Sequence, residues 1–245
     1  MKILTIVTLA GLLAGSTLTQ ASPITIPDYS FEGLTTTIAS PSSLGVGIIG
    51  TNSGSIGAWS AYSGTSLGGL NSSIASGTTN SLGAPGGADG NYVVRISLPV
   101  GAGATVDLRQ SLATTFLANS TYTLSFEIDG GTTVSLLSGS SISLLSGSTS
   151  VASLSGTNFT ALLDGNGDFQ TLTLTYQTGN TPPGGNIGID FNTASTAGAG
   201  GNIYLDNFQL DVVPIPEPGV YVLSGLGILL LVVSLRGRRV AGVKL

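Results

Sequence analysis

The chain has 245 residues, of which 12 are acidic and seven are basic, and it contains neither cysteine nor histidine. The missing residue types exclude disulfide bonds, Ser-His-Asp and Cys-His catalysis, and the common zinc and copper sites. All acidic residues fall between Asp28 and Glu217, where only Arg95 and Arg109 oppose them, so this stretch carries a formal charge of −10. Because such a surface repels polyanions, we expect no nucleic acid among the partners.

The first 21 residues are typical of a secretory signal peptide. Lys2 precedes an apolar run, and Thr-Gln-Ala at residues 19–21 precedes Ser22. This order predicts cleavage after Ala21 and export through the inner membrane. About 190 residues then remain before the tail, enough for one domain, which we place at residues 22–213.

The region after the signal is rich in turn-forming residues. Residues 24–32 alternate apolar and polar side chains around a proline, which predicts an edge strand. Residues 33–90 are rich in Gly, Ser, Thr and Asn, and the part after residue 63 predicts a long loop or a pair of weak strands. The single tryptophan, Trp59, lies here. Two interpretations of it stay open: a core side chain, or a platform that stacks on a sugar.

Regular alternation begins at residue 91. Residues 92–98, 104–112 and 120–128 predict strands, and the last has the cleanest alternation of apolar and polar side chains. Three more strands are expected at residues 169–176, 186–192 and 202–213. With no amphipathic helix in this part, about eight to ten short strands predict an all-β fold, an antiparallel β-sandwich.

A short repeat lies between these groups of strands. Residues 134–141 and 142–149 are near copies, and residues 151–156 repeat the pattern a third time. Two good copies are too few for a β-solenoid, so we expect a hairpin. The acidic stretch at residues 164–168 looks like half of an EF-hand loop but lacks the closing glutamate, which predicts a turn.

The C-terminal tail has three parts in a fixed order. Pro216-Glu217-Pro218 precedes an uncharged segment at residues 219–235, and Arg236, Arg238 and Arg239 follow. The segment corresponds to about 25 Å of helix, the short end of what spans a bilayer, so we expect a single transmembrane helix. The arginines place residues 240–245 in the cytoplasm.

This tail resembles the PEP-CTERM sorting signal of exopolysaccharide-producing Gram-negative bacteria, here at residues 214–239. The resemblance implies an exosortase as partner, a membrane protease and transpeptidase that recognises and processes the tail. The helix at residues 219–235 would then be a temporary membrane anchor, and the protein would end in the cell envelope or outside the cell. An ordinary C-terminal anchor that is never cut is the alternative.

The exported region has a second, weaker resemblance. Residues 28–32, the region of Trp59, and residues 122–127 and 203–210 resemble landmarks of galactose-binding-like jelly rolls, which include many carbohydrate-binding modules. That resemblance implies a jelly roll in which a structural calcium ion joins the first and last strands, with Glu32 and Asp206 at the matching positions. In the alternative, Glu32 is solvated and Asp206 makes a turn hydrogen bond with Asn207.

Carboxylate pairs are the remaining route to catalysis. Glu127 and Asp129 are candidates for glycoside cleavage, but strand alternation explains their spacing, and few aromatic residues are available for a sugar cleft. We therefore expect a non-enzymatic envelope or extracellular-matrix protein with a structural or adhesive role. The alternatives are a glycan-binding module of the exopolysaccharide matrix, with Trp59 as its glycan contact, and then a glycan-active enzyme.

Overall fold

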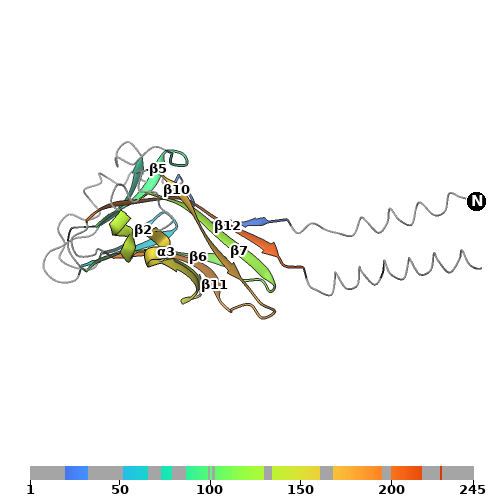
Figure 1. Cartoon of the computed structure of the whole chain (residues 1–245). Coiled ribbons are helices and arrows are strands. Elements are labelled where there is room, and N and C mark those ends of the chain that lie inside the picture. The colour runs from blue at the N-terminus through green and yellow to red at the C-terminus, as the bar shows by residue number, and fades with distance from the viewer. Residues whose placement is uncertain are drawn as a thin grey trace, which may run out of the picture. The chain divides into compact units, whose positions relative to one another are not determined.

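The computed structural model describes residues 20–32, 52–65, 73–78, 87–98, 100, 103–129, 134–160, 168–194, 200–216 and 227. Residues Ser22–Val212 form one compact unit, grouped apart from the two ends of the chain. Within this unit, the described residues form two antiparallel sheets of six strands each, which pack as two layers (Figure 1). The predicted all-β antiparallel sandwich is confirmed.

Sheet A has the strand order β10-β7-β12-β5-β4, with β1 paired to β12, and sheet B has the order β2-β3-β6-β11-β8-β9. The strands of sheet A are β1 (Ser22–Ile24), β4 (Ser73–Thr78), β5 (Tyr92–Leu98), β7 (Ser120–Asp129), β10 (Gln170–Gln177) and β12 (Gly201–Pro214). Those of sheet B are β2 (Asn52–Ile56), β3 (Trp59–Thr65), β6 (Ala104–Thr115), β8 (Ser141–Ser146), β9 (Thr149–Ser155) and β11 (Asn186–Ala194). Two short helices, η1 (Val134–Gly139) and α3 (Gly156–Thr160), complete the described elements.

Strand β7 is the core strand that its alternation predicts. Tyr122, Leu124, Phe126 and Ile128 are all buried, and the residues between them are half-buried on the other face. Leu172 and Leu174 of β10 stand opposite Phe126 and Leu124, so the apolar faces of the two strands coincide. A shift of one residue would reverse every one of these side chains, which is why the apolar pattern sets the register.

A cluster of three aromatic rings joins the two sheets. The ring centroids of Trp59, in β3, and Phe208, in β12, lie 4.7 Å apart. Phe31 lies 5.8 Å from Trp59 and 6.2 Å from Phe208, and all three side chains are fully buried. Because large aromatic side chains dominate the energetics of a core, this three-ring cluster is a main attachment between the layers.

The N-terminal turn, residues 27–32, is bonded to both sheets. The backbone N–H of Phe208 donates to the carbonyl oxygen of Tyr29 at 2.9 Å, which ties the turn to sheet A. The indole Nε1 of Trp59 donates to the carbonyl oxygen of Asp28 at 3.2 Å, which ties it to sheet B. The turn therefore closes over the three-ring cluster to which it contributes Phe31.

The edge strand predicted at residues 24–32 is shorter and lies earlier than expected. Strand β1 ends at Ile24, and left-handed backbone at Asp28 (φ 50°) and Phe31 (φ 59°) then turns the chain. Such φ values are uncommon outside glycine, so burial of the Phe31 side chain has to hold this conformation. Tertiary packing, rather than local alternation, decides the structure here.

The repeat forms a hairpin, but from different copies than expected. The first copy is the 3₁₀ helix η1, whose Leu137 is fully buried, and the second and third copies form strands β8 and β9. Near-identical sequences therefore adopt different structures because η1 packs against α3, whereas β8 pairs with β11. Residues 33–90 contain strands β2, β3 and β4.

The predicted signal peptide and membrane helix fall mostly outside this description. Residues 1–19 lie outside the described residues, as does the helix predicted at residues 219–235 apart from residue 227. Of the sorting residues, Pro216 is described and half-buried, and Glu217, Pro218, Arg236, Arg238 and Arg239 lie outside. In the part of the chain that is described, no helix is long and apolar enough to cross a membrane.

An ion cluster lies on the outer face of sheet B. Arg109 of β6 contacts Asp190 of β11 with 2.8 Å between Nη2 and Oδ2, and Asp107 lies 3.6 Å from the same Nη2. Burial is the main cause that raises the pKa of Asp107 from 3.8 to about 6, and a hydrogen bond to Asp190 and the negative charge of Asp190 add to the shift. The positive charge of Arg109 opposes it. The Asp107 carboxyl group therefore holds a proton below about pH 6.

Replacing Phe31 by alanine should destabilise the protein by about 3–5 kcal/mol, because it opens a cavity in the three-ring cluster. Urea unfolding followed by circular dichroism measures the loss. Leu117→Ala is the control, since Leu117 is 55% exposed and should cost less than about 1 kcal/mol. Equal losses in the two variants would contradict the role of the cluster.

The raised pKa of Asp107 predicts how stability depends on pH. The folded protein binds this proton more tightly than the unfolded chain, so the contribution to stability is present below about pH 4 and is lost as the pH rises through about 6. Asp107→Asn removes this loss. The gain of the variant over wild type in unfolding free energy should be larger at pH 8 than at pH 4. A gain that is the same at both pH values would refute the assignment.

Candidate functional site

A bulge in β12 places two polar side chains on the outer face of sheet A. Leu205 and Phe208 both belong to the core although they are three residues apart, so the two-residue alternation is interrupted between them. The interruption coincides with Asn207, whose φ of 49° lies in the left-handed region that asparagine tolerates better than most residues. The side chains of Asp206 and Asn207 therefore both lie on the face of β12 that points away from the core.

Asp206 is a fully buried carboxyl group, 0% exposed. Its Oδ2 accepts the backbone N–H of Asp89 and its Oδ1 accepts the backbone N–H of Asn207, each at 2.8 Å. Burial raises the pKa of Asp206 from 3.8 to about 7; the two N–H donors oppose the shift, and the charges of Glu127 and Asp89 add to it. At neutral pH this group is therefore poised to give or take a proton.

Glu127 lies beside Asp206 on the neighbouring strand. Its Oε1 accepts a hydrogen bond from Nδ2 of Asn207 at 3.3 Å, and the Oδ1 of Asn207 accepts one from Gln209 at 2.7 Å. The other oxygen of Glu127 is buried and has no hydrogen-bond partner among the described residues. Glu127 thus holds the asparagine whose backbone N–H contacts Asp206, and it supplies negative charge that disfavours ionisation of Asp206.

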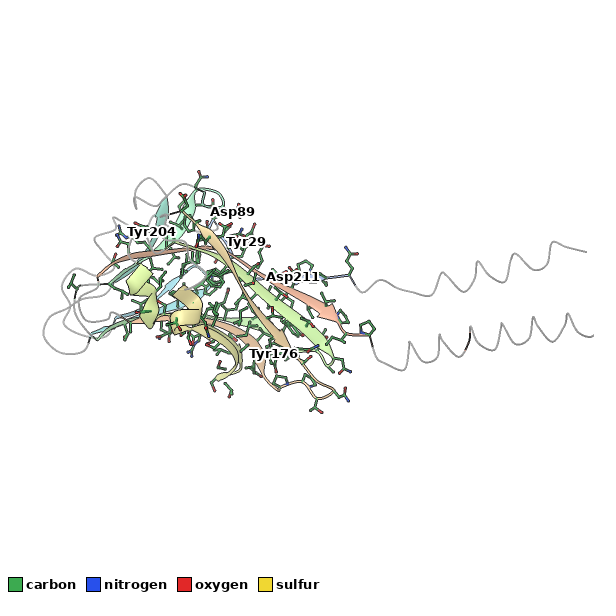
Figure 2. The ribbon with its side chains drawn as sticks, in the orientation of Figure 1. Tyr29, Asp89, Tyr176, Tyr204 and Asp211 are labelled. Atoms are coloured by element: carbon green, nitrogen blue, oxygen red, sulfur yellow. The ribbon has the colours of Figure 1, made fainter. Side chains whose placement is uncertain are left out.

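A loop at residues 87–92, whose last residue is also the first of β5, connects Asp206 with Glu32. The loop donates the N–H of Asp89 to Asp206, and it donates the N–H groups of Asn91 and Tyr92 to a single oxygen, Oε1 of Glu32, each at 2.6 Å. Figure 2 shows Asp89 with Tyr29 and Tyr204 in one region of the sandwich, away from Tyr176. Two carboxyl groups that are far apart in the sequence thus hold the same loop.

A small apolar cluster lies next to these polar groups. It is separate from the main core and consists of Val93 and Tyr204, with Ala88 and Phe169 packed against them. Tyr204 stands two residues before Asp206 on β12 and is 6% exposed, and burial is the largest cause of the raised pKa of its hydroxyl. The face thus combines a carboxyl that titrates near neutrality with an apolar and aromatic wall.

The structure brings the two predicted calcium ligands to one loop, with hydrogen bonds already made to both. The turn bond between Asp206 and Asn207 is present, and Glu32 is exposed with two backbone N–H groups on one oxygen. Among the described residues, no group of three or more acidic side chains is placed to hold a metal. The backbone N–H groups that donate to these oxygens compete with a cation. A calcium ion bound by Glu32 and Asp206 therefore stays a prediction.

The other site residues predicted from the sequence, Trp59 and Asp129, are both buried. Trp59 is 0% exposed and packed in the three-ring cluster, so it offers no free face to a sugar. Asp129, at the end of β7, is buried. Sequence reasoning did not identify Asp89, which lies 117 residues from Asp206 in the chain. Its position between Ala88 and Gly90 in a glycine-rich stretch indicated a turn, but nothing local indicated what the turn would cover.

Known proteins match this domain in sequence and in structure. The family model described as HpiC1-like, HpiC1 cyclase, matches residues 22–211. A crystal structure of a cyclase from Fischerella sp. TAU has a TM-score of 0.58 and 21% identity, over 81% of this chain and 100% of that one. None of the curated proteins compared with the chain matches it.

Two related structures contain bound compounds. The Stig cyclase FisC from Fischerella sp. TAU, in complex with (3Z)-3-(1-methyl-2-pyrrolidinylidene)-3H-indole, has a TM-score of 0.57 and 20% identity, over 80% of this chain and 100% of that one. A cyclase from the same source, in complex with 4-(1H-indol-3-yl)butan-2-one, has a TM-score of 0.54 and 19% identity, over the same shares. At these identities the likeness shows a common fold.

The family match overturns the function expected from the sequence. The expectation of a non-catalytic structural or adhesive protein is wrong, and so is the alternative of a glycan-binding module, because the matched family is one of cyclases. The absence of histidine and cysteine had excluded the best-known catalytic groups, but a buried carboxyl such as Asp206 needs neither. Matched over nearly all of its sandwich domain, the chain belongs to the HpiC1-like cyclase family.

Proposed function

We propose that the sandwich domain catalyses an acid-initiated ring closure in an apolar, indole-bearing substrate, with Asp206 as the proton donor. The observation that carries the proposal is the pKa of this buried carboxyl, raised to about 7. General acids work best when their pKa lies near the working pH, because the group then both holds the proton and releases it readily. Membership in a cyclase family supports the reaction class.

The chemistry needs no co-reactant. A proton from Asp206 adds to a double bond or imine of the substrate, and the π electrons of another part of the same molecule then attack the cation and close the ring. Loss of one proton from the closed ring to the Asp206 carboxylate restores both the neutral product and the starting acid. Substrate and product are therefore isomers of equal mass.

The surroundings of Asp206 suit such a substrate. Val93, Tyr204 and Phe169 provide an apolar wall, and an aromatic ring can stabilise a cation that forms close to its face. An indole substrate is proposed because two relatives of the same fold have indole compounds bound. The low water content of a buried site also protects a cation from capture by water.

We also propose that this reaction takes place outside the inner membrane. The family match begins at residue 22, directly after the cleavage site predicted at Ala21. Transient anchoring and exosortase processing of the tail stay predictions that rest on the sequence resemblance. Replacing Pro216-Glu217-Pro218 by alanines and following the protein in membrane fractions addresses them separately from the catalytic proposal.

Asp206→Asn should lower the rate of ring closure by about 100-fold or more, because the variant has no carboxyl proton to donate. The assay follows formation of an isomer of equal mass from a panel of 3-alkenylindoles by chromatography and mass spectrometry. The wild-type rate should fall as the pH rises above about 7, because Asp206 then loses its proton. Asp211→Asn, on the same strand, should retain activity within about threefold. Full activity in Asp206→Asn would overturn the proposal.

A further inference from the structure

The buried acid raises the question of how a substrate reaches it. Asp206 is 0% exposed, whereas Gly87, Asp89, Gly90 and Asn91 of the loop that contacts it are exposed. One hydrogen bond, from the N–H of Asp89 to Oδ2 of Asp206, joins the loop to the carboxyl. The loop therefore covers Oδ2 of the buried carboxyl, and a substrate that contacts this oxygen in place of the loop has to displace the N–H of Asp89.

Glu32 holds the loop from its other side. Its Oε1 accepts the N–H groups of Asn91 and Tyr92 at 2.6 Å each, so a single side-chain oxygen holds two neighbouring backbone groups. Glu32 directly follows Phe31, which is fixed in the three-ring cluster. The backbone next to Glu32 is thus held by the core, and the Glu32 side chain in turn holds the loop in place.

Glycines at two points let the loop adopt this position. Gly87 has a φ of 99° and Gly90 a φ of 78°, values that residues with a side chain rarely adopt. At Gly90, a Cβ would lie 2.5 Å from the Cδ and from the Oε1 of Glu32. A glycine at position 90 is therefore required for the loop and the carboxylate to approach this closely.

An apolar surface lies beneath the loop. Ala88 packs against the cluster of Val93 and Tyr204, on the same face as Asp206. Lifting the loop would uncover both an apolar wall and a carboxyl group. These are the two features that a proton-initiated cyclisation of an apolar substrate requires.

We propose that residues 87–92 form a strap that opens to admit an apolar aromatic substrate to Asp206 and closes over it, and that Glu32 is the latch that holds the strap closed. Glu32 is a positioning residue that acts through the backbone of the loop. The access role rests on the proposed function of Asp206, whereas the latch itself rests only on the hydrogen bonds and on Gly90.

Amide hydrogen exchange of the full chain, measured without substrate, tests the latch. Glu32→Ala should speed exchange at Asp89, Asn91 and Tyr92 about tenfold or more. Glu32→Gln should exchange like wild type, because a single side-chain oxygen accepts both N–H groups and glutamine retains that oxygen. Gly90→Ala should behave like Glu32→Ala, and the double variant should add little, because both changes break the same contact.

Gly147→Ala controls for backbone strain, since Gly147 has a φ of 62° but a Cβ there meets nothing within 4 Å. It should leave exchange in residues 89–92 unchanged. Unchanged exchange in Glu32→Ala overturns the latch. Equally fast exchange in Glu32→Gln also overturns it, because the role of Glu32 would then depend on charge, as a calcium ligand's does.

Binding of 4-(1H-indol-3-yl)butan-2-one as a probe tests the access role. Its association rate, measured by stopped flow, should rise several-fold in Glu32→Ala and Gly90→Ala and stay unchanged in Glu32→Gln. Faster exchange without faster association would overturn the strap as a gate. Failure of the probe to bind any variant would count against the indole substrate proposed for Asp206, while the exchange result would still decide the latch.

Discussion

The contact on which the rest of this domain depends is the packing of Phe31 against both Trp59 and Phe208. One partner comes from sheet B and the other from sheet A, so a single side chain from the N-terminal turn is bound to both layers. Hydrogen bonds from the indole Nε1 of Trp59 and from the backbone N–H of Phe208 to carbonyl oxygens of the same turn reinforce the contact. With no cysteine available, this packing has the joining role that a disulfide has in many exported domains.

The site is built outward from that contact. Phe208 follows directly after the bulge at Asn207, so the residue that closes the core also sets the position of Asp206 on the outer face. Glu32 follows directly after Phe31, so the same cluster fixes the group that holds the loop at residues 87–92. A carboxyl enclosed in this way loses hydration, and its raised pKa is the electrostatic consequence.

The sequence predicts the sandwich better than it predicts the site. Strands β5, β6 and β7 follow from two-residue alternation, because each places alternate apolar side chains in the main core. The secondary structure of the first repeat copy could not be predicted, since near-identical residues form the 3₁₀ helix η1 in one place and the strand β8 in the next. There, long-range packing overrides local preference.

The acid–base role that we propose for Asp206 could not be predicted from the sequence for a related reason. Its pKa depends on burial beneath a loop 117 residues away and on the charge of Glu127, and neither is a property of the local sequence. The sequence resemblance pairs Glu32 with Asp206 as ligands of one calcium ion, which stays a prediction. Their link in this structure, however, runs through the backbone of residues 89–92, which no residue pattern reveals.

We expect Asp206 to hold its proton near neutral pH, and carbon-13 NMR of the side-chain carboxyl groups measures this. Protein labelled with carbon-13 aspartate is titrated from pH 4 to pH 9, and the Asp206 signal is assigned by its absence from a spectrum of the Asp206→Asn variant. We predict a midpoint near 7 for this signal. A midpoint near the ordinary aspartate value of about 4 would contradict it.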